Sequence, residues 1–101
     1  MSDELLLREA DGTITVPAAT LERLIAAAAE RVGGVRVRRP RRNVDVSIAD
    51  GGATVTLHLA ARYGTVLPMV AEAVQREVVS ALRQMCALEV RSVDVAVEEL
   101  V

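Results

Sequence analysis

The stretch LPMVAEAVQREVVSALRQMCAL, from Leu67 to Leu88, carries the clearest structural signal in the chain. Its apolar residues recur every three or four positions, which places them on one face of a helix, while charged and amide side chains occupy the other faces. Proline is tolerated only in the first turn of a helix, so Pro68 sets the helix start near Leu67, with Thr65 as a candidate N-cap. The sequence therefore predicts one long amphipathic helix that packs through a single apolar stripe.

Alternating apolar and polar residues flank this helix on both sides. Before it, the segments 44–48 and 55–61 alternate, and turn residues at 50–52 separate them, which is typical of a β-hairpin. After it, the valines within 93–97 alternate with other residues and predict a last strand. A shorter alternation over 35–38 ends before Pro40, which interrupts it.

A second helix and a further strand are predicted nearer the N-terminus. Ile14 and Val16 alternate with threonine and indicate a short strand, for which the leucines at 5 and 7 offer a hairpin partner. Apolar residues then follow at helical spacing from Pro17, which suits the first turn, to Val32. The glycine pair at 33–34 ends that helix.

These elements predict an α+β fold formed by a single domain, residues 1–101. The economical packing is a two-layer domain in which two helices pack on one face of a mostly antiparallel sheet of about four strands. The opposite face of the sheet is polar and would meet water or a partner. The residues that we expect to be buried are Leu24, Ile25, Val55, Leu57, Val70, Val74, Leu82 and Val95.

Composition narrows the range of functions. All twelve basic residues are arginine, so a phosphate-loop lysine and a Schiff-base lysine are both excluded. The single cysteine rules out an internal disulfide and fits a reducing compartment. The longest apolar run is far shorter than a membrane span, and the N-terminus carries acids where a secretory signal has basic residues. We therefore expect a cytoplasmic protein with no direct membrane insertion.

The segment GGVRVRRPRRNVDV concentrates positive charge on an otherwise acidic chain. It holds Arg36, Arg38, Arg39, Arg41 and Arg42, and the remaining seven arginines stand against fourteen acidic residues. Three interpretations are open: a patch that binds an acidic protein or membrane surface, a weak nucleic-acid-binding segment, or a solvated loop. RNA-binding modules of this size add aromatic platforms or a GxxG loop, and the chain has one aromatic residue and no GxxG. Nucleic acid is therefore the less favoured partner.

No residue pattern points to catalysis, a cofactor or a metal. His58 and Cys86 are the only histidine and cysteine, and a surface histidine with an incidental thiol is the better interpretation than a nucleophile pair. One histidine, one cysteine and scattered carboxylates do not form a metal site at credible spacing. Neither glycine pair belongs to a nucleotide-binding pattern.

The segment from Val55 to the C-terminus resembles the alkaline shock protein family, the envelope stress response proteins of Gram-positive bacteria. The resemblance rests on an alternating strand that ends in Tyr63-Gly64, on Pro68, on a helix that carries Gln75, and on the valine-rich last strand. The opening GTITVPAATLERLIAAAAERVGGV also resembles the family, so the likeness extends over roughly residues 12–100. Ala87 stands where the family usually has a glycine.

The resemblance implies a non-enzymatic stress protein that acts through protein–protein interaction in cell-envelope homeostasis. Some members are recruited to the membrane by a small membrane-anchored partner, so the resemblance implies a cytoplasmic protein that can be held at the inner face of the membrane. It also implies that Tyr63, Gly64, Pro68 and Gln75 fix the corner between strand and helix. We expect self-association as well, because exposed sheet edges recruit other strands.

Overall fold

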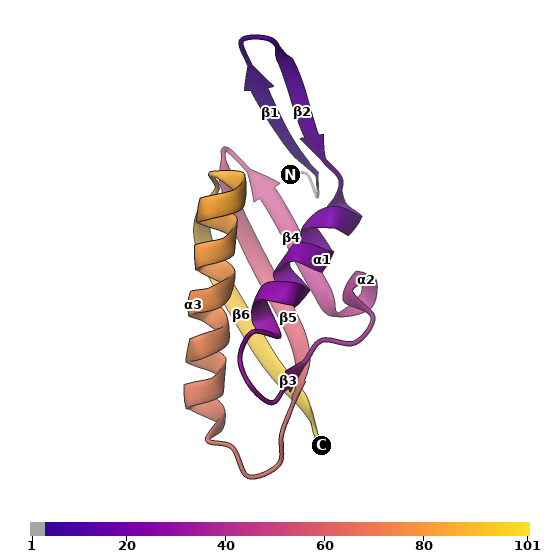
Figure 1. Cartoon of the computed structure of the whole chain (residues 1–101), viewed down its shortest axis with the longest axis vertical. Coiled ribbons are helices and arrows are strands. Elements are labelled where there is room, and N and C mark those ends of the chain that lie inside the picture. Colours follow the sequence, from indigo (N-terminus) through magenta and orange to yellow (C-terminus); the bar gives the residue numbers. More distant parts are fainter. Residues whose placement is uncertain (1–3) are drawn as a thin grey trace.

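The computed structural model describes residues 4–101, so the first three residues of the predicted domain lie outside the described part. The molecule is elongated, with extents of 50 × 21 × 20 Å, and a hairpin projects from one end of a helix-and-sheet body (Figure 1). The elements in chain order are β1 (Leu5–Glu9), β2 (Gly12–Val16), α1 (Ala18–Ala29), β3 (Val35–Arg36), α2 (Pro40–Asn43), β4 (Val44–Ala49), β5 (Gly52–Ala61), α3 (Leu67–Cys86) and β6 (Glu89–Leu100).

Strands β4 and β5 form the predicted hairpin. They pair antiparallel from Val44 opposite Leu57 to Ala49 opposite Gly52, so the loop between them has two residues. Both loop residues, Asp50 and Gly51, have positive φ angles of 52° and 73°. Two-residue loops of this kind match the twist of the flanking strands, and Asp-Gly is among the pairs that tolerate them. The local sequence signal was therefore sufficient for this element.

The four-stranded sheet is mixed rather than mostly antiparallel, which corrects the sequence prediction. Strands β3 and β4 both pair antiparallel with β5, but β5 pairs parallel with β6 along most of its length. Parallel neighbours need a crossover connection, and α3 supplies it between the end of β5 and the start of β6. Strand β6 is consequently an edge strand of this sheet.

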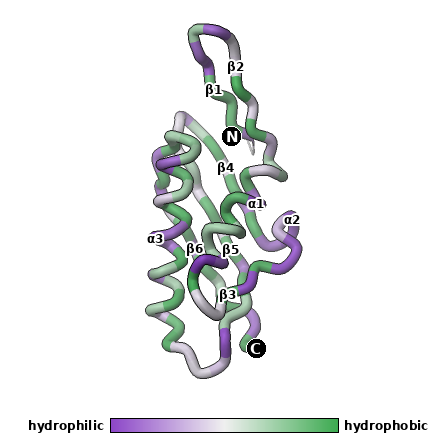
Figure 2. The backbone as a smooth tube through the Cα atoms, viewed as in Figure 1, coloured by the Kyte–Doolittle hydropathy of each residue, from purple (hydrophilic) through white to green (hydrophobic). Residues whose placement is uncertain are grey.

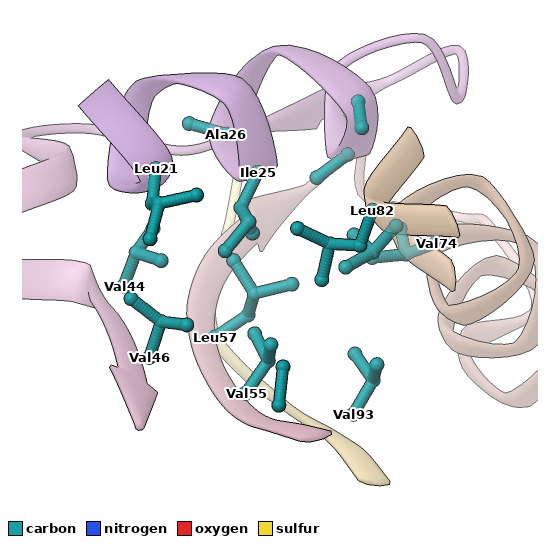
Figure 3. Close-up of a cluster of buried hydrophobic side chains, with 14 of the residues drawn as sticks. Leu21, Ile25, Ala26, Val44, Val46, Val55, Leu57, Val74, Leu82 and Val93 are labelled. Atoms are coloured by element: carbon teal, nitrogen blue, oxygen red, sulfur yellow. The ribbon is translucent and has the colours of Figure 1, made fainter. Parts of the chain in front are cut away.

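The hydrophobic core lies between α1, α3 and the apolar side chains of β4, β5 and β6. Helix α1 packs against α3 and β4, and α3 packs against β6. Figure 3 shows Leu21 of α1 directed at Val44 of β4 and Ile25 directed at Leu57 of β5, with Leu82 of α3 close by. Of the residues predicted to be buried, five are fully buried, namely Ile25, Val55, Leu57, Val74 and Leu82, whereas Leu24, Val70 and Val95 are partly buried against the core.

Strands β1 and β2 form a separate two-stranded sheet. They pair antiparallel from Leu5 opposite Val16 to Glu9 opposite Gly12. The leucines at 5 and 7 do supply the partner for the strand at 12–16, but the hairpin does not join the four-stranded sheet. Pro17 alone connects β2 to α1, and its carbonyl accepts hydrogen bonds from the backbone N–H groups of Thr20 and Leu21.

The α+β class is confirmed, with two differences of detail in the helices. Residues 4–101 contain three helices instead of the two predicted, because a single turn, α2, forms within the arginine-rich segment. Thr65 does not cap α3: its hydroxyl donates a hydrogen bond to the carbonyl of Arg62, and the residue at the N-cap position is Val66. Pro68 lies in the first turn of α3, as the sequence predicts.

Candidate functional site: the arginine turn and the β5–α3 loop

The arginine-rich segment is an ordered turn. Pro40 begins the single-turn helix α2, and the backbone N–H of Arg42 donates to the carbonyl of Arg39 at 2.8 Å. The side-chain amide of Asn43 donates to the carbonyl of Arg38 and ties the end of the turn to its beginning. Arg39 has a φ of 46°, a left-handed conformation that brings the chain into the turn. We call residues 36–42 the arginine turn; Figure 2 colours this stretch as strongly hydrophilic.

Two of the five arginines are engaged in ion pairs. Arg38 Nη1 lies 3.3 Å from Glu99 Oε1 of β6, and Arg41 Nη1 lies 3.8 Å from Glu22 Oε1 of α1. Arg36, Arg39 and Arg42 are exposed and form no ion pair with any residue between 4 and 101. The five arginines are therefore not equivalent: two are partly neutralised, and three remain available to a partner.

Arg62 extends the basic surface, and the sequence analysis missed it. Strand β3 pairs with the end of β5 so that Val35 lies opposite Ala61, and the backbone N–H of Arg62 donates to the carbonyl of Gly34 at 3.0 Å. Gly34 has a φ of 84°, and a Cβ there would lie 3.2 Å from the Cβ of Arg62, so glycine permits this close approach. Arg36 and Arg62 line the same shallow depression of about 360 Å³.

The loop between β5 and α3 exposes large apolar side chains beside Arg62. Tyr63, the only aromatic residue, is 78% exposed, and Val66 and Met69 are also well exposed. Gly64 has a φ of 95°, which turns the chain from β5 toward α3. The backbone N–H of Tyr63 donates to the carbonyl of Val101. Tyr63 thus presents an apolar ring to solvent next to the basic surface.

Gln75 connects the long helix to the edge strand. Its side-chain Nε2 donates to the backbone carbonyl of Val93 in β6 at 2.9 Å, and this hydrogen bond is partly buried. A glutamine at this position therefore fixes α3 relative to β6 and occupies a backbone acceptor of the edge strand. Edge strands with free backbone groups invite pairing with other chains, so this contact also reduces that tendency near Val93.

The histidine and the cysteine lie in different environments. His58 Nδ1 lies 3.1 Å from Glu98 Oε2, a contact that becomes an ion pair when the imidazole is protonated. Cys86 is buried in the hydrophobic core, and this burial raises the pKa of its thiol. A thiol with a raised pKa is a poor nucleophile at neutral pH, because less of it is thiolate. Within residues 4–101, no group of three or more histidine, cysteine or acidic side chains is placed to hold a metal ion.

The arginine turn presents exposed guanidinium groups, and its Arg36 shares a depression with Arg62, which is followed in sequence by the exposed Tyr63. These residues offer unpaired guanidinium groups for carboxylates or phosphates, with exposed apolar groups beside them. No helix in the described part of the chain is both long enough and apolar enough to span a membrane.

Comparison with known proteins identifies a family and a fold. The model of the alkaline shock protein 23 family, described as having a cell envelope-related function, matches residues 36–101, and this match confirms the resemblance to the alkaline shock protein family. A search of curated proteins finds no match.

Two solved structures of the MamM CTD are similar to this chain. A histidine-to-aspartate variant in its cadmium form is 24% identical with a TM-score of 0.62, covering 80% of this chain and 94% of that chain. A variant with an aspartate and a histidine replaced by alanine is 21% identical with a TM-score of 0.55, covering 80% of this chain and 92% of that chain. At these identities the similarity concerns the fold alone, and the cadmium belongs to the other protein.

Proposed function

The chain belongs to the alkaline shock protein 23 family, with its cell envelope-related function, and from this premise we propose that it is a non-enzymatic interaction module of the envelope stress response. In this proposal it acts as one domain without a cofactor. It resides in the cytoplasm, and a membrane-anchored protein partner recruits it to the inner face of the membrane. Helices α1 and α3 together cover one face of the sheet, so that the arginine turn and the β5–α3 loop stay free for the partner.

The observation that carries the proposal is the set of unpaired arginines on an ordered turn. Arg36, Arg39 and Arg42 are exposed, and none of them forms an ion pair with a residue between 4 and 101. A long basic side chain on an ordered backbone loses less entropy on binding than one on a mobile loop. A guanidinium group also matches the planar, bidentate geometry of a carboxylate. The turn is therefore suited to an acidic partner.

The apolar neighbours specify the partner further. Tyr63, in the β5–α3 loop next to Arg62, and Met69, in the first turn of α3, are largely exposed. Aromatic residues, methionine and arginine are the residue types that protein interfaces favour. The partner is accordingly an acidic segment that also offers apolar side chains, such as an amphipathic cytoplasmic segment of a membrane-anchored protein.

A weak nucleic-acid-binding function is the second candidate. Guanidinium groups also bind phosphates, and the same unpaired arginines favour this candidate. Against it, two of the five arginines are paired with Glu22 and Glu99, and the rest of the chain is acidic. A single exposed tyrosine offers little stacking surface for bases.

The test compares two triple variants with equal charge changes. Arg36, Arg39 and Arg42 are replaced by glutamine in the first, and the exposed Arg76, Arg83 and Arg91 are replaced in the control. Each variant is titrated with three probes at two salt concentrations: a synthetic amphipathic peptide rich in glutamate and leucine, vesicles containing anionic lipid, and single- and double-stranded oligonucleotides. Surface substitutions of this kind change the free energy of unfolding by less than about 0.5 kcal/mol.

We expect the peptide to bind the wild-type protein and the control, and to bind the first variant at least about tenfold more weakly. The difference should be larger at low salt, where surface charges are screened less. Preferential binding of oligonucleotides that the first variant abolishes would favour the second candidate. If the wild-type protein bound the vesicles more tightly than the peptide, the partner of the arginine turn would be a lipid surface and not a protein. Equal behaviour of both variants with all probes would contradict the role of the arginine turn.

A further inference from the structure

The β1–β2 hairpin is supported by its own chain only near its base. Its two strands pair with each other but with no strand of the four-stranded sheet, and Figure 1 shows the hairpin projecting beyond the body. Leu5, at its base, belongs to the buried core, and Leu7 and Val16 are partly buried against that core, whereas Ile14 farther out is half exposed. A two-stranded hairpin is at best marginally stable in water unless it packs against something else. The outer part of the hairpin, around Ile14, therefore needs a further surface to pack on.

One face of the hairpin is apolar. Leu5 pairs with Val16 and Leu7 with Ile14, and side chains of these pairs share one face because successive residues of a strand alternate. Leu5 seats this face in the core at the base, while Ile14, farther out, is 49% exposed. Figure 2 colours the two strands mainly as hydrophobic, with hydrophilic residues near the turn.

Acidic residues lie at the outer end of the same face. Glu9 follows Leu7 by two positions and so points to the same side, and Asp11 lies in the turn. Glu9 and Asp11 are exposed, and neither forms an ion pair with the described residues.

The helix layer has an apolar groove that is complementary to this face. It lies between α1 and α3 and has a volume of about 470 Å³. Its lining includes Leu24, Ala28, Ala81 and Met85, together with Arg23 and Arg31. Met85 is 71% exposed. Arg23 and Arg31 are exposed and form no ion pair within residues 4–101.

The hairpin cannot reach this groove in its own chain. Pro17 is the only residue between β2, which ends at Val16, and α1, which begins at Ala18. Its φ of −62° is fixed by the proline ring. The hairpin is therefore held pointing away from α1, with no slack to fold back over it.

We propose that the β1–β2 hairpin of one copy packs into the α1–α3 groove of a second copy, and that the exchange is reciprocal. Ile14 lies on the apolar floor, and Glu9 and Asp11 approach Arg23 and Arg31. The lengths are similar: a five-residue strand spans about 17 Å, and α1 rises about 14 Å from Thr20 to its end at Ala29, with Arg31 just beyond. In a two-fold dimer each copy contributes one hairpin and one groove, so both hairpins are packed in the same assembly.

The first test measures the mass in solution over the micromolar range by sedimentation equilibrium. We expect the wild-type chain to dimerise. Ile14→Lys on the apolar face and Met85→Glu in the groove should each raise the dimer dissociation constant at least about tenfold. The controls are Leu6→Lys, which alters an equally exposed residue on the opposite face of the hairpin, and Met69→Glu, which alters an exposed methionine at the other end of α3. Both controls should dimerise as the wild type does.

The second test exchanges charges, so that a loss of folding cannot imitate the result. One chain carries Glu9→Arg and Asp11→Arg, and the other carries Arg23→Glu and Arg31→Glu. Each chain alone should dimerise weakly, because both of its contacts oppose like charges. Mixed together, they should form a heterodimer in which one of the two contacts regains opposite charges in exchanged order and the other keeps the original order.

Three results would overturn the proposal: a monomeric wild-type chain throughout the range, dimers that survive all the hairpin and groove variants, or no heterodimer in the mixture. The variant with glutamine at Arg36, Arg39 and Arg42 should remain a dimer. Failure of the proposed function and failure of this inference are therefore distinguishable.

Discussion

The body and the hairpin of this molecule differ in how far their apolar side chains are buried. In the body, Leu57 of β5 and Leu82 of α3 are completely buried, and they share one core with α1. In the hairpin, only Leu5 is buried, and Leu6 and Ile14 are about half exposed. The two regions are joined by one residue, Pro17.

The difference shows where each region obtains its stability. The body buries a continuous set of aliphatic side chains, each of which contributes roughly 1.5–3 kcal/mol when removed from water. The hairpin has the hydrogen bonds of a two-stranded ladder, one buried leucine, and Leu7 and Val16 partly buried against the core, which is little for a two-stranded sheet. We infer that the body is stable within one chain, whereas the hairpin depends on a second copy.

The largest effect is expected in the core of the body. Leu57→Ala leaves a cavity among Ile25, Val55 and their neighbours, so it should lower the free energy of unfolding by about 2–5 kcal/mol. Ile14→Ala in the hairpin should cost less than about 1 kcal/mol when the protein is dilute, because the side chain is half exposed. Urea denaturation followed by circular dichroism measures both. If both variants lowered the free energy of unfolding equally, the proposed difference in stability between the body and the hairpin would be contradicted.

A gain in stability is expected at the end of α3. Ala87 occupies the C-cap position with a φ of 53° and a ψ of 30°. Its N–H donates to the carbonyl of Arg83, so the backbone conformation is fixed by the helix end. Alanine is strained in this left-handed region and glycine is not. Ala87→Gly should therefore raise the free energy of unfolding by up to about 1 kcal/mol.

Ala87→Gly acts only on the body, so it should leave dimerisation unchanged. Gly33→Ala, at an exposed glycine without a positive φ, serves as the comparison and should not destabilise the protein. A destabilised Ala87→Gly variant would contradict the strain argument.

A smaller effect is expected from the buried thiol at alkaline pH. Burial raises the pKa of Cys86, so the folded chain holds this proton more tightly than the unfolded chain, whose thiol ionises near pH 9.0. The stability contributed by the protonated thiol is complete below pH 9.0 and decreases as the pH rises above it. Relative to Cys86→Ala, the wild-type protein should therefore lose stability above this pH. Parallel pH profiles of the two proteins would contradict the prediction.

Local sequence patterns were sufficient for several elements. The apolar spacing from Leu67 and the proline at 68 located α3, and Asp50-Gly51 located the β4–β5 hairpin. Each of these signals involves residues close together in the chain, where helical period, turn conformation and proline geometry act directly. The family was recognisable for the same reason, because its motif is a contiguous strand, corner and helix.

Features that depend on distant contacts were not predicted. The parallel pairing of β5 with β6 is decided by how α3 crosses the sheet, and strand alternation is the same in parallel and antiparallel pairs. Arg62 joins the basic surface because the two-residue strand β3 pairs with the end of β5. The turn α2 depends on the side chain of Asn43 reaching the carbonyl of Arg38. The glutamates that neutralise Arg38 and Arg41 come from β6 and α1.

Hydrogen exchange at several protein concentrations tests the contrast between body and hairpin most directly. At low concentration, amides of residues 5–16 should exchange much faster than those of β5 and α3, because the hairpin opens without unfolding the body. As the concentration rises and dimers form, exchange in residues 5–16 should slow, while the arginine turn should not change. Hairpin amides that are as protected as the body in the dilute monomer, or that do not respond to concentration, would contradict the account.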